Sequence, residues 1–193
     1  MAAVRLISPR RFGDDRGWFT ETYNSEKYQA LGVDVTFVQD NHSLSRPPWV
    51  LRGLHFQTPP RTQDKLVRCV RGRIWDVAVD VRQGSPTFGR WVAAELSADN
   101  GHQLFVPTGF AHAFLTLAPD SEVEYKVSAP YAPECDGGLL WNDPVLNIAW
   151  PLEGHQPVLS DKDTRLPRLA EWTSPFAYDG DPLSPLDPEP VTP

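Results

Sequence analysis

Short runs of alternating apolar and polar residues follow one another along the chain, and turn residues separate them. The clearest run extends from Arg73 to Arg82, where Trp75, Val77 and Val79 share one face. A second run, from Glu122 to Ala129, alternates in the same way. Successive side chains of a β-strand point to opposite faces of its sheet, so a period of two residues predicts strands that are buried on one face.

Similar but shorter patterns predict further strands at Val4–Ser8, Trp18–Tyr23, Val35–Gln39, Val50–Gln57, Lys65–Arg71, Trp91–Leu96, Gln103–Val106 and His112–Leu117. Strands at intervals of about ten residues, with turns between them, are typical of an antiparallel sandwich or barrel. One helix is expected at Asn24 to Leu31, with Ser25 as its N-cap and Gly32 at its end. A second, short helix is expected around Leu166 to Trp172.

The segment Val50–Gln57 carries the first candidate chemistry. Strict alternation would place His55 on one face and Arg52 on the other. Gly53 removes a side chain from the middle of the strand, which indicates either a β-bulge or a close approach to the backbone. A bulge would bring Arg52 and His55 to the same side, where both could reach one cavity. Taken alone, the segment favours a buried core histidine and a surface arginine over a functional site.

Composition narrows the class of protein. The 193 residues are enough for one domain with a substantial core. The formal net charge of −7 argues against non-specific binding of nucleic acid, which needs a basic surface. Two cysteines, Cys69 and Cys135, form no disulfide framework and fit a reducing compartment. No apolar run approaches the length of a membrane span, so we expect a cytoplasmic protein with no membrane partner.

The C-terminal segment differs in composition from the rest of the chain. After Tyr178 the sequence is rich in proline and in acidic residues. Such segments bury too little apolar surface to offset the entropy that ordering would cost. The composition therefore predicts a single folded domain over residues 1–177 and a disordered tail over residues 178–193.

Six segments stand in the order found in a known family. They are Asp15–Glu21, Phe37–Ser43, Leu51–Gln57, Val106–Phe114, Trp141–Pro144 and Leu159–Asp163. In these segments the chain resembles the dTDP-4-dehydrorhamnose 3,5-epimerase family of cupin-type sugar-nucleotide epimerases, over roughly Arg5 to Phe176. The resemblance implies an antiparallel jelly-roll barrel with a few short helices, an active site inside the barrel, and a homodimer.

The resemblance also implies the reaction. It is the epimerisation of dTDP-4-dehydro-6-deoxy-D-glucose at C3 and C5 to dTDP-4-dehydro-L-rhamnose, an isomerase reaction of deoxysugar biosynthesis that uses no cofactor and no metal. In this relationship His55 is the base that removes the proton beside the C4 ketone, and Asp163 holds its other ring nitrogen. Tyr125 is the acid on the opposite face, and Lys65 stabilises the enolate oxygen.

Ligand contacts follow from the same resemblance. Arg52 is expected at the diphosphate, and the other residues expected to line the substrate site are Gln39, Asn41, His112, Tyr131, Asp136 and Lys162. Arg16, Phe19 and Glu21 belong to the segment 15–21, which is expected to reach the nucleotide in the partner subunit. Two departures from the family pattern stand out: Asp136 replaces a more usual glutamate, and the loop Arg46–Trp49 is one residue longer than usual.

These residue types suit epimerisation beside a ketone, which needs a base on one face of the carbon and an acid on the other. Histidine, with a reference pKa of ~6.5, is mostly unprotonated at neutral pH, and a carboxylate at its second nitrogen stabilises the imidazolium that forms. Tyrosine, with a reference pKa of ~10, stays protonated and can donate. A preorganised ammonium at the enolate oxygen commonly contributes ~3–4 kcal/mol. The sequence has no glycine-rich phosphate loop that opens a helix, which agrees with the absence of a dinucleotide cofactor.

Three alternatives remain open from the sequence. A metal-dependent cupin would need histidines such as His42, His55 and His112 to converge, although Gln57 stands where such cupins usually carry a second histidine. A non-catalytic jelly roll that binds sugar nucleotides is disfavoured because both His55 and Tyr125 are present. A 3- or 5-mono-epimerase of another dTDP-4-keto-deoxysugar would share the same base and acid.

Overall fold

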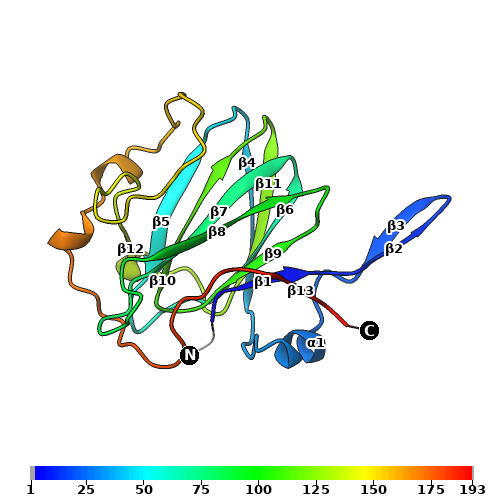
Figure 1. Cartoon of the computed structure of the whole chain (residues 1–193), viewed down its shortest axis with the longest axis horizontal. Helices are drawn as coiled ribbons and strands as arrows, with labels where there is room; N and C mark the ends of the chain where they lie inside the picture. Colours follow the sequence, from blue (N-terminus) through cyan, green and yellow to red (C-terminus); the bar gives the residue numbers. More distant parts are fainter. Residues whose placement is uncertain (1–2, 193) are drawn as a thin grey trace.

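The computed structural model describes residues 3–192, and two β-sheets packed face to face form its body (Figure 1). The first sheet contains β1 (Arg5–Ser8), β4 (Gln39–Ser45), β6 (Lys65–Arg71), β9 (Gln103–Val106), β11 (Ser121–Val127) and β13 (Pro188–Pro190). The second contains β5 (Leu51–Gln57), β7 (Arg73–Asp80), β8 (Trp91–Ser97), β10 (Phe110–Thr116) and β12 (Asp136–Gly138). Their strand orders are β13-β1-β9-β6-β11-β4 and β12-β5-β10-β7-β8.

Among the described strands, the pairings within these two sheets are antiparallel except that of β1 with β13. The other described elements are a hairpin of β2 (Arg11–Asp14) and β3 (Gly17–Thr20), the helix α1 (Ser25–Ala30), and 3₁₀ turns at Pro133–Cys135, Asp163–Arg165 and Leu169–Glu171. The predicted all-β, antiparallel fold with a few short helices is therefore confirmed. None of the helices in residues 3–192 has the length and apolar character needed to cross a membrane.

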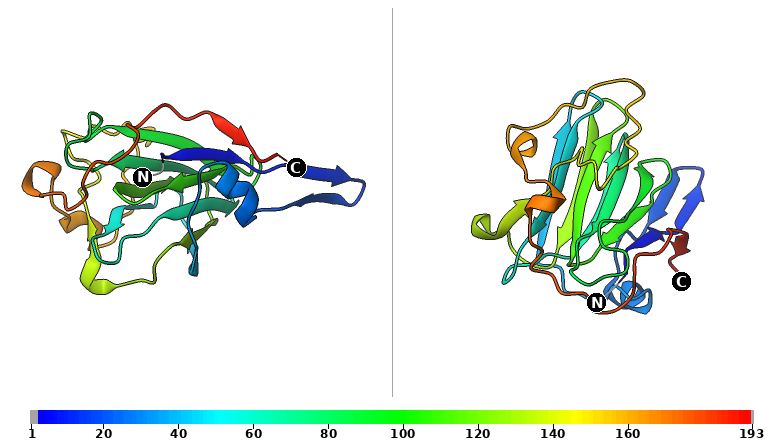
Figure 2. Two further views of the ribbon diagram at one scale, coloured as in Figure 1. Left: turned by 90° about the horizontal axis from the view of Figure 1, so that it is seen from below. Right: turned by 60° about the vertical axis from the view of Figure 1, so that its left-hand side comes forward.

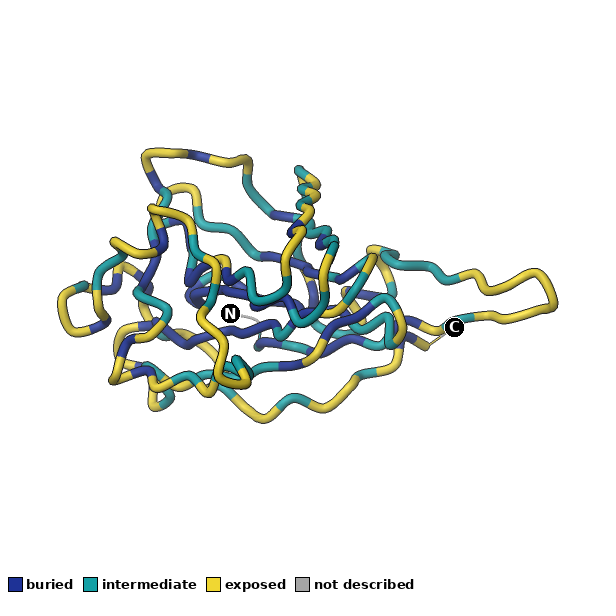
Figure 3. The backbone as a smooth tube through the Cα atoms, turned by 90° about the horizontal axis from the view of Figure 1, so that it is seen from above, coloured by how far each residue is buried: buried dark blue, intermediate teal, exposed yellow. Residues whose placement is uncertain are grey.

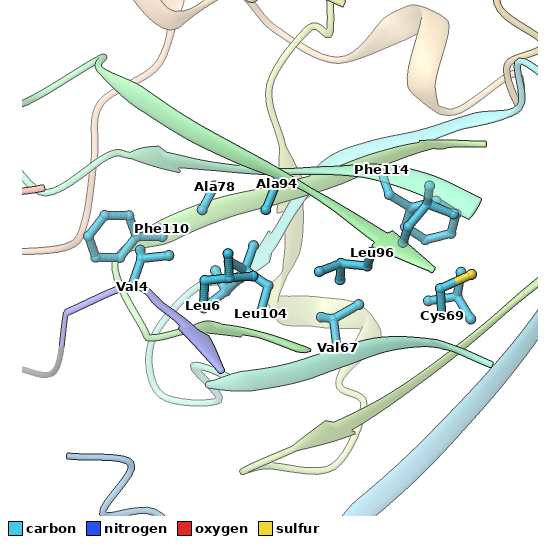
Figure 4. Packing of buried hydrophobic residues seen from close by; sticks show 13 residues of the cluster. Val4, Leu6, Val67, Cys69, Ala78, Ala94, Leu96, Leu104, Phe110 and Phe114 are labelled. Carbon is cyan, nitrogen blue, oxygen red and sulfur yellow. The ribbon is translucent and has the colours of Figure 1, made fainter. Parts of the chain in front are cut away.

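The main core lies between the two sheets. Its side chains come from both of them, and Figure 4 shows Leu6, Val67 and Leu104 of the first sheet close to Ala94 and Leu96 of the second. This apolar cluster fills one part of the interior. The remaining part is lined by polar side chains and forms the cavity described below.

A second cluster covers the outer face of the five-stranded sheet. Alternate residues of β7, Val77 and Val79, pack there against Leu139, Leu169 and Phe176 from the C-terminal third of the chain. Because both faces of this sheet are covered, β10 is buried along its whole length. A strand in a sheet that is buried on both faces has a nearly continuous apolar sequence, which is why Phe110–Thr116 shows little alternation.

The predicted bulge at Gly53 is present. Three residue steps on β5, from Arg52 to His55, match only two on β10, from His112 to Phe114. Gly53 has φ of +119°, and a Cβ atom added to it would lie 2.5 Å from the carbonyl oxygen of His112. Only glycine fits this backbone, and the extra residue turns Arg52 and His55 toward the same side.

Side-chain capping and a proline correct the two helix predictions. The N-cap of α1 is Asn24 instead of Ser25, since the Asn24 side chain accepts hydrogen bonds from the amides of Glu26 and Lys27 at 3.1 and 3.2 Å. The short helix expected around Leu166 to Trp172 is only a 3₁₀ turn at Leu169–Glu171. Pro167 disfavours helical backbone at the preceding residue, and Leu166 is extended.

The strand expected at Val35–Gln39 begins only at Gln39 and continues through the polar run to Ser45 as β4. Alternate side chains of β4, from Gln39 to Ser45, face the interior, where they line cavities. A polar inner face is compatible with a strand here because it borders a cavity and not the apolar core.

The β2–β3 hairpin projects away from the body of the molecule (Figures 1 and 2). Figure 3 shows that it is exposed over nearly its whole length. Phe12, Trp18 and Phe19 expose 49%, 59% and 69% of their surface. Three large exposed aromatic residues on one hairpin form an apolar surface that isolated proteins rarely leave uncovered.

The C-terminal tail differs from the disordered segment that its composition predicted. Its residues Pro188–Pro190 form β13, which pairs in parallel with β1 (Figure 2). Arg5 of β1 forms an ion pair with Glu189 at 3.0 Å, and Val191 is buried in a third apolar cluster together with Tyr28 of α1. The edge of β1 and this apolar cluster stabilise the segment, and neither is visible in the composition of the tail.

Candidate active site

A cavity of about 620 Å³ opens between the two sheets. Polar side chains from four strands, one 3₁₀ turn and the loop before it line this cavity. They are Arg52 and His55 of β5, Lys65 of β6, His112 of β10, Tyr125 of β11, Asp163 at the start of the 3₁₀ turn Asp163–Arg165, and Ser160 of the preceding loop. A second cavity of about 210 Å³ is lined by Gln39, Asn41, Tyr131, Asp136 and Lys162. His55, Lys65 and Tyr125 line both cavities, so they stand where the two meet.

His55 and Asp163 are paired as predicted. The ring nitrogen Nε2 of His55 lies 2.6 Å from Oδ1 of Asp163, and Asp163 is buried whereas the His55 side chain is 30% exposed. The second carboxylate oxygen of Asp163 accepts a hydrogen bond from the Ser160 hydroxyl at 2.8 Å. Burial alone would raise the pKa of Asp163, but the interactions with His55 and Ser160 lower it below its usual 3.8. Asp163 is therefore a carboxylate that accepts the Nε2 proton, which leaves Nδ1 of His55 as the basic nitrogen.

Lys65 is buried beside this pair. Its ammonium donates to the backbone carbonyl of His55 at 3.2 Å. Burial lowers the pKa of Lys65 from 10.5 to about 8, although the negative charges of Asp76 and Asp136 act in the opposite direction. The group is thus mostly charged at neutral pH and has hydrogen-bonding capacity left for a ligand oxygen.

Tyr125 approaches the cavities from the sheet opposite to that of His55, since β11 belongs to the six-stranded sheet and β5 to the five-stranded one. Burial raises the pKa of its phenol above the usual 10, and the positive charge of Arg52 opposes this rise. A protonated phenol and an imidazole therefore face one cavity from its two walls.

A second histidine–carboxylate pair forms part of the floor. Nε2 of His112 lies 2.6 Å from Oδ1 of Asp76, and both residues are buried. The sequence predicts His112 at the site but gives no such prediction for Asp76. The only signal for Asp76 in the sequence was a carboxylate on the inner face of a strongly alternating strand.

Arg52 reaches the mouth of the larger cavity. Its guanidinium donates to the Ser45 hydroxyl at 3.3 Å and to the Leu44 carbonyl oxygen at 3.4 Å. These contacts with β4 keep the cation at the cavity and leave donors free for an anion. Arg46, from the longer loop, lines the same cavity.

The smaller cavity is lined by five more of the predicted ligand residues. Lys162 forms an ion pair with Asp136, and the Tyr131 hydroxyl lies 3.4 Å from the same carboxylate. Gln39 donates to Asn41 at 2.9 Å and accepts the amide of Tyr131 at 3.1 Å. These contacts hold the segment around Tyr131 next to β4. Asp136, the departure from the family pattern, thus still borders the cavity.

Arg16, Phe19 and Glu21 do not reach either cavity of their own chain. Arg16 pairs with Asp14 at the tip of the projecting hairpin, and Glu21 pairs with Lys27 at 3.1 Å. The structure of one chain therefore separates these three residues from the other predicted ligand contacts.

The three histidines of the metal-cupin alternative do not converge. His55 and His112 face the interior with separate carboxylate partners, and His42 lies on the outer side of β4, where it contacts Glu122 at 3.0 Å. Residues 3–192 contain no group of three or more histidine, cysteine or acidic side chains arranged to hold a metal ion. Gln57 instead bonds three backbone groups, those of Arg61, Pro130 and Ala132.

Comparisons with known proteins agree with this geometry. The sequence model of the family described as dTDP-4-dehydrorhamnose 3,5-epimerase matches residues 1–171. An enzyme of that name from Sinorhizobium fredii (strain NBRC 101917 / NGR234) is 53% identical over 178 residues, which make up 92% of this chain and 91% of the relative.

Solved structures extend the similarity to the fold. The crystal structure of dTDP-4-dehydrorhamnose 3,5-epimerase from Bacillus anthracis str. Ames, with TDP and PPi bound, is 52% identical, with a TM-score of 0.83 over 86% of this chain and 93% of that one. The epimerase from Legionella pneumophila, in complex with dTDP-4-keto-L-rhamnose, is 42% identical, with a TM-score of 0.87 over 92% of this chain and 94% of that one. The predicted jelly roll of the cupin type is thereby confirmed. With a family match over most of its length and a relative more than half identical, this chain belongs to the dTDP-4-dehydrorhamnose 3,5-epimerase family of isomerases.

Proposed function

We propose that the protein converts dTDP-4-dehydro-6-deoxy-D-glucose to dTDP-4-dehydro-L-rhamnose by inverting C3 and C5. The observation that carries this proposal is the pairing of His55 with Asp163 on one wall of a cavity whose opposite wall presents Tyr125. Names and bound ligands of the relatives support the substrate class, since those structures hold TDP or a dTDP-keto-sugar.

The reaction follows from the charges of these groups. Nδ1 of His55 takes the proton from the carbon beside the C4 ketone, and the electron pair moves to the C4 oxygen to form an enolate. Asp163 stabilises the imidazolium through Nε2, and the Lys65 ammonium stabilises the enolate oxygen. Tyr125 then delivers a proton to the opposite face of the carbon and regains one from solvent, while His55 releases its proton to solvent.

We assign binding of the nucleotide part to polar residues that line the larger and the smaller cavity. Arg52 provides paired N–H donors for the diphosphate, and His112 lines the same cavity. Gln39, Asn41, Tyr131, Asp136 and Lys162 provide the polar lining of the smaller cavity. We assign these residues to substrate binding and His55, Asp163, Tyr125 and Lys65 to the chemistry.

We further propose a homodimer in which the hairpin segment 15–21 of one copy reaches the ligand cavity of the other. The projecting hairpin, with its exposed aromatic side chains, supports this assembly because its own body leaves them uncovered. Arg16, Phe19 and Glu21 would then contact the nucleotide in the partner. A monomer mass by light scattering at micromolar concentration would contradict the proposed homodimer.

The two free, buried cysteines support a cytoplasmic location, which cell fractionation tests.

Proton NMR in D2O tests the proposed reaction. Wild-type enzyme is expected to introduce deuterium at both C3 and C5 of dTDP-4-dehydro-6-deoxy-D-glucose, because both protons are removed and replaced from solvent. His55→Ala is expected to lose both exchange and product formation while it remains folded. Tyr125→Phe is expected to lose product formation more severely than exchange, because proton removal survives.

The outcomes separate the candidate functions. Deuterium at only one carbon would identify a mono-epimerase, and wild-type activity in His55→Ala would remove this residue from the base role. Equal losses of exchange and product formation in Tyr125→Phe would contradict its role as the acid.

A further inference from the structure

Ser160, which is not among the predicted site residues, contacts the Asp163 carboxylate and sets its orientation. Oδ1 of Asp163 lies 2.6 Å from Nε2 of His55, and Oδ2 lies 2.8 Å from the hydroxyl oxygen of Ser160. The same hydroxyl oxygen accepts the backbone amide of Asp163 at 3.2 Å. Because Ser160 accepts from this amide and carries a single hydroxyl hydrogen, that hydrogen is directed to Oδ2.

We propose that Ser160 is a positioning residue for catalysis, which locks the Asp163 carboxylate so that Nε2 of His55 keeps its proton and Nδ1 remains free to act as the base. This inference rests on the proposed base role of His55. It adds to that proposal a third group, which acts through the Asp163 carboxylate.

The path of the loop is held by other contacts. The amide of Val158 donates to the carbonyl of Trp49 at 2.7 Å, and the amide of Leu51 donates to the carbonyl of Val158 at 3.0 Å. The indole of Trp49 stacks on the ring of His155 with centroids 4.7 Å apart. Since these contacts already fix residues 155–158 to the start of β5, the Ser160 hydroxyl is not needed to hold that part of the loop.

A free carboxylate can rotate, whereas Asp163 has a partner on each oxygen. The Asp163 side chain is 3% exposed, so water cannot readily replace a lost donor. Loss of the Ser160 hydroxyl would leave Oδ2 without this bond in a buried site. A carboxylate with one donor fewer is also a stronger base, so it would stabilise the imidazolium form of His55 more strongly.

Ser160→Ala tests the inference, with Thr164→Ala as the matched control. Thr164 belongs to the same 3₁₀ turn as Asp163, but its hydroxyl donates to the carbonyl of Asp161 and not to the carboxylate of Asp163. We expect Ser160→Ala to lower kcat about tenfold or more, since a hydrogen bond to a charged group is lost. KM should stay within about twofold, and the acid limb of the kcat/KM profile should move to higher pH.

Ser160→Thr keeps a hydroxyl and is expected to restore most of kcat and the position of the acid limb. Thr164→Ala should match the wild type in both. If Ser160→Ala has wild-type kcat, or loses activity with an unshifted acid limb and a lowered Tm, the positioning role is wrong. Full activity of His55→Ala would instead overturn the proposed function, so the two failures are distinguishable.

Discussion

Lys65, Tyr125 and Asp163 are the cavity residues whose pKa values are shifted by their surroundings. Burial lowers the pKa of Lys65 to about 8 and raises that of Tyr125, while hydrogen bonds and charge lower that of Asp163 despite its burial. At neutral pH the three are therefore an ammonium, a phenol and a carboxylate. This is the set of protonation states that proton transfer through His55 and Tyr125 requires.

Lys65 provides a prediction of pH dependence. Its ammonium is present below a pH of about 8 and is lost as the pH rises through this value, so kcat should fall toward alkaline pH. Lys65→Arg should lack this alkaline limb, because a guanidinium keeps its proton, although kcat will be lower with the altered geometry. Steady-state kinetics from pH 6 to 10 measure the limb.

Lys126→Arg is a suitable control, since Lys126 lies on the outer side of β11 and pairs with Asp40. It should keep the wild-type profile. An alkaline limb near pH 8 that persists in folded Lys65→Arg would assign the limb to another group.

At the scale of elements, β5 decides which side chains meet. Its bulge sets Arg52 and His55 on one side, and the loop attached to its first residues presents Ser160 and Asp163 to His55. β11 presents Tyr125 from the other sheet. The site therefore depends on one irregular strand more than on any regular feature of the barrel.

Gly53→Ala tests the importance of this bulge. A Cβ at Gly53 would lie 2.5 Å from the His112 carbonyl oxygen and 2.6 Å from the Ala113 Cβ, at a φ that alanine rarely adopts. We expect the free energy of unfolding to fall by about 3 kcal/mol or more, with a severe loss of kcat in the folded fraction. Urea unfolding and steady-state kinetics measure the two effects.

Gly84→Ala provides the matched control, because Gly84 also has a positive φ but has no atom within 4 Å of the added Cβ. Gly84→Ala introduces the backbone strain without the close contact. We expect it to lower the free energy of unfolding by about 1–2 kcal/mol and to leave kcat unchanged. Equal destabilisation of the two variants would mean that the close approach to β10 is unimportant.

At the scale of the whole molecule, the C-terminal segment connects the apolar clusters. Phe176 belongs to the cluster outside the five-stranded sheet, Leu183 and Leu186 pack against the core between the sheets, and Val191 belongs to the cluster under α1. The residues that line the two cavities end at Asp163. The segment thus contributes to stability and lies outside the site.

Truncation after Gly180 separates these effects. Loss of the apolar contacts of Leu183, Leu186 and Val191 should lower the free energy of unfolding by about 3 kcal/mol and Tm by roughly 6–12 °C. The kcat at 25 °C should stay within about twofold. A chain ending at Val191 is the control and should match the full chain, and an unchanged Tm after the longer truncation would restore the view of a disordered tail.

Much of the fold was predictable from short-range pattern. The alternation in Arg73–Arg82 and Glu122–Ala129 predicted β7 and β11, and Gly53 predicted the bulge in β5. Predictions failed where distant contacts decide local structure. Polar β4 is a strand because it borders a cavity, and the acidic tail is ordered because the edge of β1 accepts β13.

The sequence by itself determined which residue types are present for proton transfer, and the order of the six segments that identify the family. Only the tertiary structure decided which of these residues meet, since 108 positions separate His55 from Asp163 and their contact exists only in the folded chain. Burial likewise sets the pKa of Lys65, and a burial value is a property of packing. The roles of Asp76 and Ser160 became visible for the same reason: a hydrogen bond is defined by distance in space, which the spacing of residues along the chain does not contain.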